Sequence, residues 1–460
     1  MPAVDPLRIQ SLNETPAASG RYVLYWMQQS QRALHNPALT HAIEIANDAG
    51  VPVRVVFGIM DQFPEANERH YTFMLEGLQE TRCTLAQRGI PMEVYHGHPV
   101  DVALEHAADA VELVVDRGYL RHQRAWRKRV ADEAPCHVVQ VEGDVVVPVE
   151  VPTDKPEYAA RTIRPKIHDH LDRFLRVPAS LTPEHTGEDV ETAGLPLDDV
   201  SSVIAQLSLN DRVPAVSSLF RGGTFEAKAI LDDFLETQLA GYDDNRNQIH
   251  THAVSHMSKY LHFGQVSPVW LAQQIQQSGG PAEDVDSYIE ELIVRRELAI
   301  NHVYFCPDTY DDWACLPEWA RDTLLEHAED EREYVYNLEA FEQSRTHDPY
   351  WNAAMKEMRD TGYMHNYMRM YWGKKILEWT PDPQTALQWT LHLNNKYFLD
   401  GRDPNSYANV LWIFGLHDRG WKERPVYGKT RYMSQNGLKR KADPDAYVDK
   451  VNRLAQRAHG

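Results

Sequence analysis

The sequence is poor in cysteine and lacks any long apolar run. It contains four cysteines, Cys83, Cys136, Cys306 and Cys315. Their spacing fits neither a zinc site nor a C-x-x-C redox pair, so we expect reduced, structural thiols. No stretch approaches the roughly 18 apolar residues that a membrane span needs, and the N-terminus has no basic region followed by an apolar one. These absences predict a cytoplasmic protein without a membrane anchor.

Charge is distributed unevenly along the chain. The 460 residues carry a net charge of −20, which taken alone argues against a nucleic-acid partner. Residues 401–460, however, hold twelve Lys and Arg against six Asp and Glu. Because salt screens charges that lie more than about 10 Å away, a local basic surface can still bind a polyanion.

Strand and helix patterns alternate in the first part of the chain. Short β-branched or aromatic runs cover residues 22–27, 51–60, 92–97, 111–116 and 137–147, with helical patterns between them at 68–89 and 99–109. This order predicts an α/β domain over residues 1–176, with a doubly wound parallel sheet whose ligand sites lie at the carboxyl ends of its strands. A glutamine-rich segment, residues 28–31, follows the first run in place of G-x-G-x-x-G, so we expect no nicotinamide dinucleotide site.

The rest of the chain divides into a linker and a helical domain. Residues 177–209 are rich in Pro, Ser, Thr, Asp and Glu with weak periodicity, which predicts an interdomain linker. Strand signals vanish after Pro214, so we expect residues 210–460 to form an all-α domain.

A basic run, residues 117–131, holds six Lys and Arg and no acidic residue. A solvated helix face is the ordinary explanation of such a run. Binding of nucleic acid and docking of the second domain are the alternatives, and the sequence leaves them open.

Residues 348–379 predict two helices separated at residues 361–362. On the second helix one face carries His365, Arg369, Trp372, Ile376 and Trp379. A buried helix with aromatic filler is one interpretation of this face.

A polar cluster just downstream favours a different interpretation. Within twelve residues it contains Asn394, Asn395, Asp400, Arg402, Asp403 and Asn405. Buried polar groups at this density need a polar ligand to satisfy them. The two segments together therefore predict a large, flat, polar-edged cofactor held among helices.

Two further segments carry candidate ligand-binding residues. In residues 252–268, Ser255 and Ser258 precede a helical run, where hydroxyl and free backbone N–H groups can hold a phosphate. The histidines nearby match no recognised metal site, because no carboxylate or thiolate is spaced among them. In the helix at residues 287–302, Glu291 and Arg295 are one turn apart, which fits a surface ion pair, and the alternative places Glu291 in a cavity wall.

The last segment, residues 415–441, mixes basic and aromatic side chains. Trp421, Tyr427 and Tyr432 alternate with Lys and Arg, a mixture that stacks on bases while neutralising phosphates. A solvated basic tail is the alternative.

Two long motifs resemble the signatures of class II cyclobutane pyrimidine dimer photolyases. They are YIEELIVRRELAIN at residues 288–301 and GLHDRGWKERPVYGKTRYMS at residues 415–434. Between them, MHNYMRMYWGKKILEW (364–379) and LDGRDPNSYANVLW (399–412) are similar to the flavin-binding core of the same family. The departures from the family pattern remove no polar group that the chemistry needs; they are Tyr288, His302, Tyr427, Thr430 and Ser434.

The resemblance implies an FAD bound in the helical domain and an antenna domain built on the N-terminal sheet. The implied cofactor contacts are Tyr242, Val254, Ser255, His256, Met257 and Ser258 around the phosphates and ribityl chain, and Asn366, Arg369, Asp400 and Asp403 around the rings. Arg369 and Asp400 would form a pair, and Asn394 would lie near the flavin N5. The residues do not identify the antenna chromophore, which is a deazaflavin or a folate if one is bound.

The resemblance also implies light-driven repair of cyclobutane pyrimidine dimers in double-stranded DNA, by electron transfer from excited, reduced FAD to a flipped-out lesion. Glu291 would hydrogen-bond the lesion, and Trp412 would stack against it. The other implied DNA contacts are Arg295, Trp421, Lys429 and Arg431, and Arg295 stands where some relatives carry an aromatic residue. A chain of Trp351, Trp372 and Trp379 would reduce the oxidised flavin in light. We expect a monomer with no metal.

Two other functions remain open from the sequence. A cryptochrome-like photoreceptor shares the fold and the flavin, but it would be expected to carry an extended C-terminal tail, and this sequence ends about 25 residues after its last motif. A flavin oxidoreductase would need a nicotinamide site, which the sequence does not show.

Overall fold

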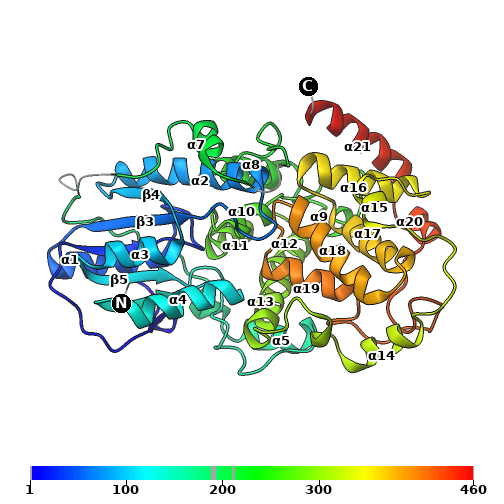
Figure 1. Cartoon of the computed structure of the whole chain (residues 1–460), viewed down its shortest axis with the longest axis horizontal. Helices are drawn as coiled ribbons and strands as arrows, with labels where there is room; N and C mark the ends of the chain where they lie inside the picture. The colour runs from blue at the N-terminus through cyan, green and yellow to red at the C-terminus, as the bar shows by residue number, and fades with distance from the viewer. Residues whose placement is uncertain (1–2, 188–192, 210–212, 459–460) are drawn as a thin grey trace.

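The computed structural model of the protein describes residues 3–187, 193–209 and 213–458. Figure 1 shows a sheet-containing half and a helical half lying side by side. Residues 188–192 of the predicted linker and residues 210–212 at the start of the predicted helical domain lie outside the described residues. No described helix is long and apolar enough to cross a membrane.

Six strands form one sheet in the order β1-β6-β5-β2-β3-β4. They are β1 (Ile9–Ser11), β2 (Tyr22–Trp26), β3 (Val53–Ile59), β4 (Met92–His96), β5 (Ala110–Asp116) and β6 (His137–Val141). Neighbouring strands run parallel, except that β1 pairs antiparallel with β6. The predicted parallel sheet is confirmed, and each of the five predicted runs contains a strand. The short edge strand β1 was not predicted.

Helices cover both faces of this sheet. On one face lie α1 (Pro37–Ala49), α2 (Glu68–Ala86) and α7 (Val200–Gln206), and on the other lie α3 (Pro99–Ala107) and α4 (Arg121–Glu133). Val23 and Tyr25 of β2 face the first group, and Leu24 and Trp26 face the second, so both sides of the strand are buried. Because the chain continues from β2 toward β4 and then returns to β5 on the other side, β2 and β5 form the topological switch point.

The segment predicted as a linker packs against the sheet half. Leu197, Ile204 and Leu207 are buried in the same core as α1 and α2, and Gln79 of α2 donates to the Leu197 carbonyl. The domain boundaries at residues 176 and 209 stay predictions.

The other half is helical, and the structure describes no strand within residues 213–458. Its helices, with the short ones that precede it, are η1 (Pro6–Arg8), α5 (Ala160–His168), α6 (Leu171–Phe174), α8 (Thr224–Thr237), α9 (Tyr242–Asn245), α10 (Ser258–His262), α11 (Pro268–Gln277), α12 (Ala282–Ile289), η2 (Glu290–Arg295), α13 (Arg296–Phe305), η3 (Trp313–Cys315), α14 (Glu318–Glu326), α15 (Leu338–Glu342), α16 (Pro349–Thr361), α17 (Asn366–Trp379), α18 (Pro383–Tyr397), α19 (Pro404–Ile413), α20 (Gln435–Lys441) and α21 (Pro444–Ala458). The predicted all-α character is confirmed.

The two helices predicted within residues 348–379 are α16 and α17, and the break lies where the sequence placed it. Asp348 caps the start of α16 by accepting from the backbone N–H groups of Tyr350 and Trp351. Gly362 ends the helix in the left-handed region, with a φ of 71°, and His365 then caps α17. This turn lets α17 pack back against α16.

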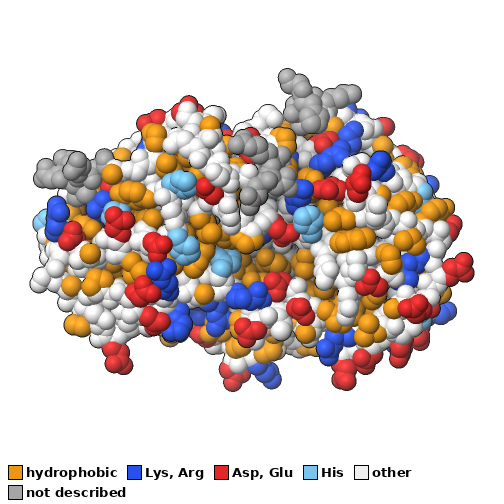
Figure 2. All heavy atoms as spheres, viewed as in Figure 1, with side chains coloured by type: hydrophobic (Ala, Val, Ile, Leu, Met, Phe, Trp, Pro, Cys, Tyr) orange, Lys and Arg blue, Asp and Glu red, His pale blue; other side chains and the backbone are white. Residues whose placement is uncertain are grey.

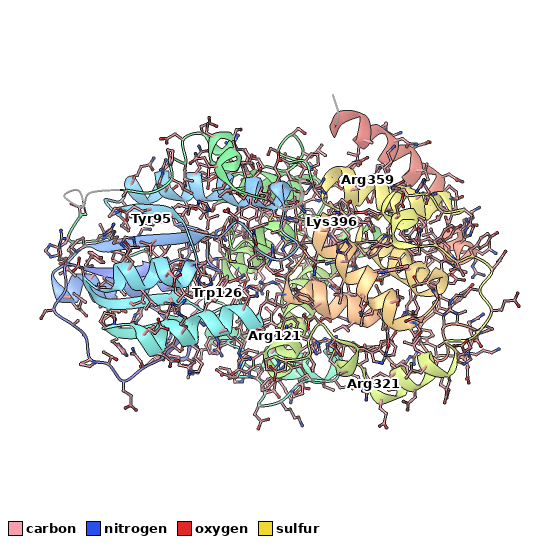
Figure 3. All side chains as sticks on the ribbon, viewed as in Figure 1. Tyr95, Arg121, Trp126, Arg321, Arg359 and Lys396 are labelled. Carbon is pink, nitrogen blue, oxygen red and sulfur yellow. The ribbon has the colours of Figure 1, made fainter. Side chains whose placement is uncertain are left out.

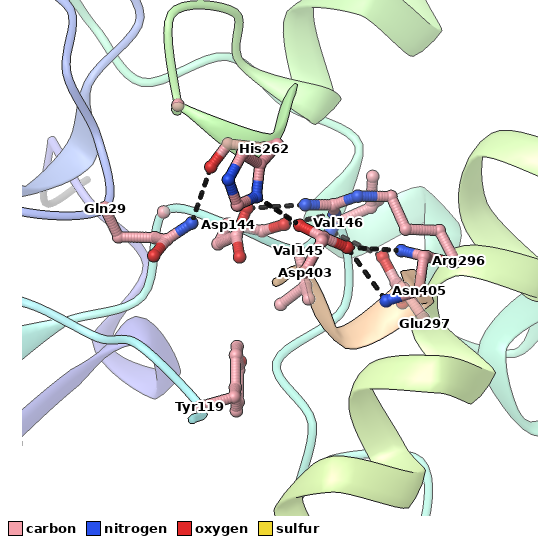
Figure 4. Close-up of polar contacts among 12 residues, drawn as sticks. Gln29, Tyr119, Asp144, Val145, Val146, His262, Arg296, Glu297, Asp403 and Asn405 are labelled. Atoms are coloured by element: carbon pink, nitrogen blue, oxygen red, sulfur yellow. Dashed lines mark hydrogen bonds and ion pairs between the residues drawn. The ribbon is translucent and has the colours of Figure 1, made fainter. Parts of the chain in front are cut away.

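Residues 142–147 were predicted as strand but form a loop that contacts the helical half. The N–H groups of Val146 and Val147 donate to the Glu297 carboxylate, and Arg296 pairs with Asp144, as Figure 4 shows. Arg8 donates to the Val146 carbonyl from the other side. The backbone groups of this loop are satisfied by side chains, so no further strand pairing forms.

The basic run in residues 117–131 docks the helical half. Arg121, labelled in Figure 3 at the boundary of the two halves, binds Asp311 at 2.9 Å, and Arg124 donates to the Tyr304 carbonyl at 2.9 Å. Arg117 pairs with Glu150 at 3.0 Å. Basic side chains gather over α4 in Figure 2, and two of them, Arg121 and Arg124, join the two halves, whereas the rest of this charge is bonded within the sheet half.

Candidate functional site

The expected pair of Arg369 and Asp400 is present and confirms that part of the prediction. The guanidinium of Arg369 on α17 lies 3.0 Å from the carboxylate of Asp400, which follows α18, and it stacks 3.8 Å from the Phe398 ring centroid. Burial alone would raise the pKa of Asp400, but the charge and hydrogen bond of Arg369 hold it below its ordinary value. Asp400 is therefore a carboxylate held charged inside the helical half.

Lys259 faces the same carboxylate and was missed by the sequence analysis. Its side chain is 1% exposed, and its ammonium group donates to the His256 carbonyl and lies 3.9 Å from the Phe220 ring centroid. Burial lowers the pKa of Lys259 to about 7, although Asp400 opposes this shift. Arg369 is thus bonded to Asp400, and the buried amine of Lys259 lies close enough for the charge of the same carboxylate to affect it, an arrangement that suits an anionic ligand. Nothing in the sequence marked Lys259, because its burial depends on long-range packing.

Buried polar atoms without protein partners surround this charged group. They include Nε2 of His365, Nδ1 of His256, Oε1 of Glu357 and Nε1 of Trp372. Because buried polar atoms almost always have a hydrogen-bond partner, these atoms indicate a bound polar group. A flavin with its phosphates and ribityl hydroxyls offers the mixture of donors and acceptors that they need, so the residues present fit FAD.

The predicted phosphate-side residues lie at the turn leading into α10. His256 adopts a φ of +56°, Met257 is buried, and the Ser255 hydroxyl is 2.7 Å from the Tyr288 hydroxyl. The Tyr242 ring packs 5.4 Å from the Tyr288 ring. Val254 and Ser258 flank this turn, with Ser258 as the first residue of α10.

The remaining predicted ring-side residues are dispersed. Asn394 is buried on α18 and donates to Asn395 at 3.0 Å, whereas Asn366 is exposed at the start of α17. The Asp403 carboxylate caps α19 by accepting from the Asn405 N–H and is bound by His262 at 3.1 Å (Figure 4). Asp403 therefore faces the boundary between the two halves.

The three predicted electron-transfer tryptophans form one buried series. Trp351 donates its indole N–H to the Trp372 carbonyl at 3.0 Å, and its ring lies 6.0 Å from the Trp379 ring. The side chains of Trp351, Trp372 and Trp379 are 0%, 1% and 3% exposed. Trp351 therefore contacts the backbone of Trp372 and the ring of Trp379, and Trp372 is one turn from Arg369 along α17.

The helix that carries Glu291 corrects an expected ion pair. Residues 290–295 form a π-helix, and Arg295 pairs with Glu290 at 3.0 Å, not with Glu291. The reason is that a π-helix brings residues five apart onto one face, where an α-helix brings residues four apart. Glu291 instead accepts from Arg246 at 2.9 Å and remains about one-third exposed.

The C-terminal basic segment forms an aromatic and cationic surface. The Arg431 guanidinium lies 5.2 Å from the Trp412 ring and 4.3 Å from the Trp421 ring, and it binds Asp418 at 3.0 Å. Trp421 is 38% exposed, its backbone N–H donates to the Lys429 carbonyl at 2.8 Å, and Lys429 is also exposed. The structure thus brings together three predicted DNA-binding residues and leaves Lys429 at the surface.

A separate cavity lies at the carboxyl ends of β2 and β3, beside the switch point. Its empty volume is about 910 Å³, and Trp26, Gln29, His122, Trp126 and His262 are among the lining residues. Burial lowers the pKa of His122 to about 4, so this ring is neutral. The glutamine-rich segment after β2 was the sequence signal for this cavity, although it was interpreted only as the absence of a nucleotide motif.

Comparisons with known proteins agree with this geometry. The family model for DNA photolyase matches residues 23–185, and the model for the FAD binding domain of DNA photolyase matches residues 288–451. The chain is 47% identical to a deoxyribodipyrimidine photo-lyase of Methanothermobacter thermautotrophicus, over 97% of this chain and 98% of that protein. It is 40% identical to the protein of the same name from Arabidopsis thaliana, over 94% of this chain and 89% of the relative.

A solved structure shares the fold. It is an archaeal photolyase from Sulfolobus tokodaii, described with two FAD molecules and with the implication of a novel light-harvesting cofactor. The TM-score is 0.69 at 17% identity, and the match covers 94% of this chain and 89% of that chain.

Proposed function

Because this chain belongs to the DNA photolyase family, we propose that it is a deoxyribodipyrimidine photo-lyase, which splits cyclobutane pyrimidine dimers in DNA under light. The observation that carries the proposal is the buried group of Arg369, Lys259 and Asp400, surrounded by unpaired polar atoms. When bound and reduced, FAD supplies the electron that opens the cyclobutane ring after excitation.

The chain's own residues hold and orient this cofactor. Arg369 and Lys259 offset the negative charge of the cofactor, and Asp400 fixes the position of Arg369. The remaining proposed contacts are Tyr242, Val254, Ser255, His256, Met257 and Ser258 on the phosphate side, and Asn366, Asn394 and Asp403 on the ring side. We place Asp403 as a positioning residue, because its carboxylate bonds to His262 and to the Asn405 N–H group.

Glu291 and Trp412 are the proposed lesion contacts. Arg246 holds the Glu291 carboxylate at 2.9 Å, which fixes the direction of the side chain. Trp412 is backed by the buried ammonium group of Lys374, 5.8 Å from its ring. A flipped-out dimer can stack on this ring, at an unstacking cost of a few kcal/mol that is smallest for a damaged base.

The exposed surface around Trp421 is the proposed contact with double-stranded DNA. Lys429 supplies a positive charge that can bind phosphates, and Arg431 contacts both the Trp412 and Trp421 rings and so holds their orientation. Arg295, which is about half exposed and paired with Glu290, is a further candidate at the edge of this surface.

The cavity beside the switch point is the proposed site of an antenna chromophore of the deazaflavin or folate class. Trp126 and His122 meet edge to face at 5.0 Å in its wall, so the cavity offers aromatic surface to a flat ring system. Mass spectrometry of material released from the protein would identify the chromophore. Trp126→Ala should reduce its occupancy and leave the FAD content unchanged.

The state of the cysteines supports a proposed location for the protein. All four cysteines are free, which supports a reducing compartment and therefore the cytoplasm. We propose that the protein acts there as a monomer.

The deciding experiment is a repair assay with an oligonucleotide that contains one thymine dimer. Protein loaded with reduced FAD should restore the thymines under blue light and should do nothing in the dark. A cryptochrome-like photoreceptor would bind FAD and respond to light without restoring the dimer. That outcome, in which the flavin is bound and the thymine dimer stays unrepaired, would overturn the proposal.

A further inference from the structure

A second groove runs along α4 at the boundary between the two halves of the molecule. Its lining includes residues of α4, residues of the edge strands β1 and β6, and Tyr304 of α13. Its empty volume is about 1070 Å³, similar to the roughly 300–1,000 Å³ of sites that hold small molecules. Among the described residues, none lines both this groove and the cavity beside the switch point. The α4 groove, named for this helix, is therefore distinct from that cavity.

Cations outnumber carboxylates in the α4 groove. The charged residues that line it are Arg117, Arg124, Arg127, Lys128, Asp132 and Glu150. Glu150 binds Arg117 at 3.0 Å, and Asp132 binds Lys128 at 2.7 Å. Within the described part of the chain, the two other arginines bond to uncharged oxygens. The groove therefore carries a net positive charge that its own carboxylates do not offset.

Arg127 is the more deeply buried of these two arginines. It is 7% exposed, and it donates through Nε to Gln140 at 3.0 Å and through Nη2 to the Gly118 carbonyl at 2.6 Å. Its buried Nη1 atom has no hydrogen-bond partner among the described residues. Burial lowers the pKa of Arg127 to about 10, although the charge of Glu142 opposes this shift, so the guanidinium stays charged at neutral pH. Because a buried arginine is almost always paired, its unpartnered nitrogen indicates an anion that the chain itself does not supply.

Arg124 adds a second charge on the same side of the helix. It precedes Arg127 by three residues on α4, and side chains at this spacing lie on one helix face. Arg124 is half-buried, donates to the Tyr304 carbonyl at 2.9 Å and lies 5.2 Å from the Tyr304 ring centroid. These contacts hold its guanidinium in the groove without neutralising it.

We propose that the α4 groove binds a phosphate ester of small-molecule size, with its phosphate on Arg124 and Arg127. A phosphate monoester carries a charge of about −1.5 to −2 at pH 7, which matches two guanidinium groups better than a single carboxylate does. The planar guanidinium also binds phosphate oxygens through two parallel hydrogen bonds. Leu12, Ala125 and Ala131 give the groove an apolar wall for the organic part of the ester.

The burial of the cations favours a small molecule over a nucleic acid. Because Arg127 is 7% exposed, only a group that enters the groove can reach its guanidinium. The phosphates of a duplex lie on the outside of a wide rod and meet exposed cations, of which Lys429 is an example in this protein.

The test uses the full chain loaded with FAD, so that the flavin site is filled. Isothermal titration calorimetry at low salt would measure the binding of phenyl phosphate, inorganic phosphate and phenol. Phenyl phosphate should bind, inorganic phosphate should bind more weakly, and phenol should not bind. Arg124→Gln and Arg127→Gln should each weaken the binding of phenyl phosphate by about 10-fold or more, as expected for the loss of a charged hydrogen bond.

Arg129→Gln is the matched control variant. It removes the same charge from α4, but Arg129 binds Asp101 and Glu133 and does not line the groove. This variant should bind phenyl phosphate as wild type does. FAD content and circular dichroism report folding in every variant, and the half-buried Arg124 provides the test if Arg127→Gln does not fold.

Three results would overturn the inference. One is the absence of phenyl phosphate binding by wild type at millimolar concentration, and another is equal weakening in Arg124→Gln and Arg129→Gln. Equal affinities for phenyl phosphate and inorganic phosphate would assign the groove to free phosphate instead of an ester. Release of phenyl phosphate by undamaged duplex DNA, with a loss of DNA affinity in Arg124→Gln, would assign it to nucleic acid and would overturn the inference as well.

Discussion

Arg431 and Lys429 lie close together in sequence, yet the structure predicts different consequences when each is replaced. Arg431 is paired with Asp418 and lies between Trp412 and Trp421. Lys429 is exposed and carries its charge into solvent. The double variant Arg431→Gln/Asp418→Asn removes the ion pair without changing the net charge, and Lys429→Gln removes one charge without touching the pair.

The expected magnitudes follow from these contacts. Loss of one phosphate contact lowers the magnitude of the slope of log K against log salt by about 0.9. When salt is raised from 50 to 200 mM, the affinity of wild type should therefore fall by a factor about 3.5 times larger than the affinity of Lys429→Gln. The charge-neutral pair variant should keep the wild-type slope. It loses two cation–π contacts, worth about 1–2 kcal/mol together, that orient the tryptophans in the free protein, so the loss of affinity for damaged DNA should be at most roughly 5- to 30-fold.

Fluorescence anisotropy with matched damaged and undamaged duplexes at four salt concentrations would measure both quantities. Lys429→Gln should weaken binding to the two duplexes equally, and the pair variant should weaken binding to the damaged duplex more than to the undamaged one. A slope change of about one in the pair variant would show that Arg431 contacts phosphate despite Asp418. Equal loss on both duplexes would refute the role of Arg431 in holding the two tryptophans.

Three further predictions concern the lesion, the tryptophan series and pH. Glu291→Ala should lower the quantum yield of repair at unchanged FAD content, measured by photon-counted dimer restoration. Trp372→Phe should repair dimers when FAD is reduced chemically but should not reach the reduced state under blue light with an external donor. Burial, and the nearby His417, lower the pKa of His302 in the folded protein from 6.5 to about 4. As pH falls, the unfolded chain therefore binds this proton before the folded protein does. The folded state loses stability between pH 6.5 and 4 for this reason. In His302→Phe, the free energy of unfolding in urea should fall by about 3 kcal/mol less over this pH range than in wild type. An unchanged pH dependence would contradict this prediction.

The fold was predictable from the sequence because its signals are local. Runs of β-branched residues separated by helical patterns determine a doubly wound sheet whichever residues later pack on it. The strand β1 was not predicted, because its three residues, Ile9–Ser11, are too few to show a periodic pattern. Residues 142–147 had the composition of a strand, but Arg8, Arg296 and Glu297 take up their backbone or side-chain groups. Such contacts, more than 130 residues apart, leave no local pattern.

The site was predictable where a motif carried it and hidden where burial decided it. The pairing of Arg369 with Asp400 followed from the resemblance, and the structure contains it. The charge state of Lys259 depends on Phe220 and Asp400, which are distant in sequence. The partner of Glu291 differs from the expected one because residues 290–295 form a π-helix, whose turn contains more residues than an α-helical turn. No residue type predicts a π-helix from the sequence.

A single loop between α18 and α19 connects the two sites of the molecule. Asp400 faces Arg369 on the flavin side, and two residues later Arg402 lines the cavity at the sheet. Asp403 then binds His262, which also lines that cavity (Figure 4). Arg402 adopts a φ of +62° here, so the loop turns sharply enough for successive side chains to point to opposite sides. A flavin beside Arg369 and a chromophore in the cavity would therefore both contact this one loop, so replacements in it are expected to affect both sites.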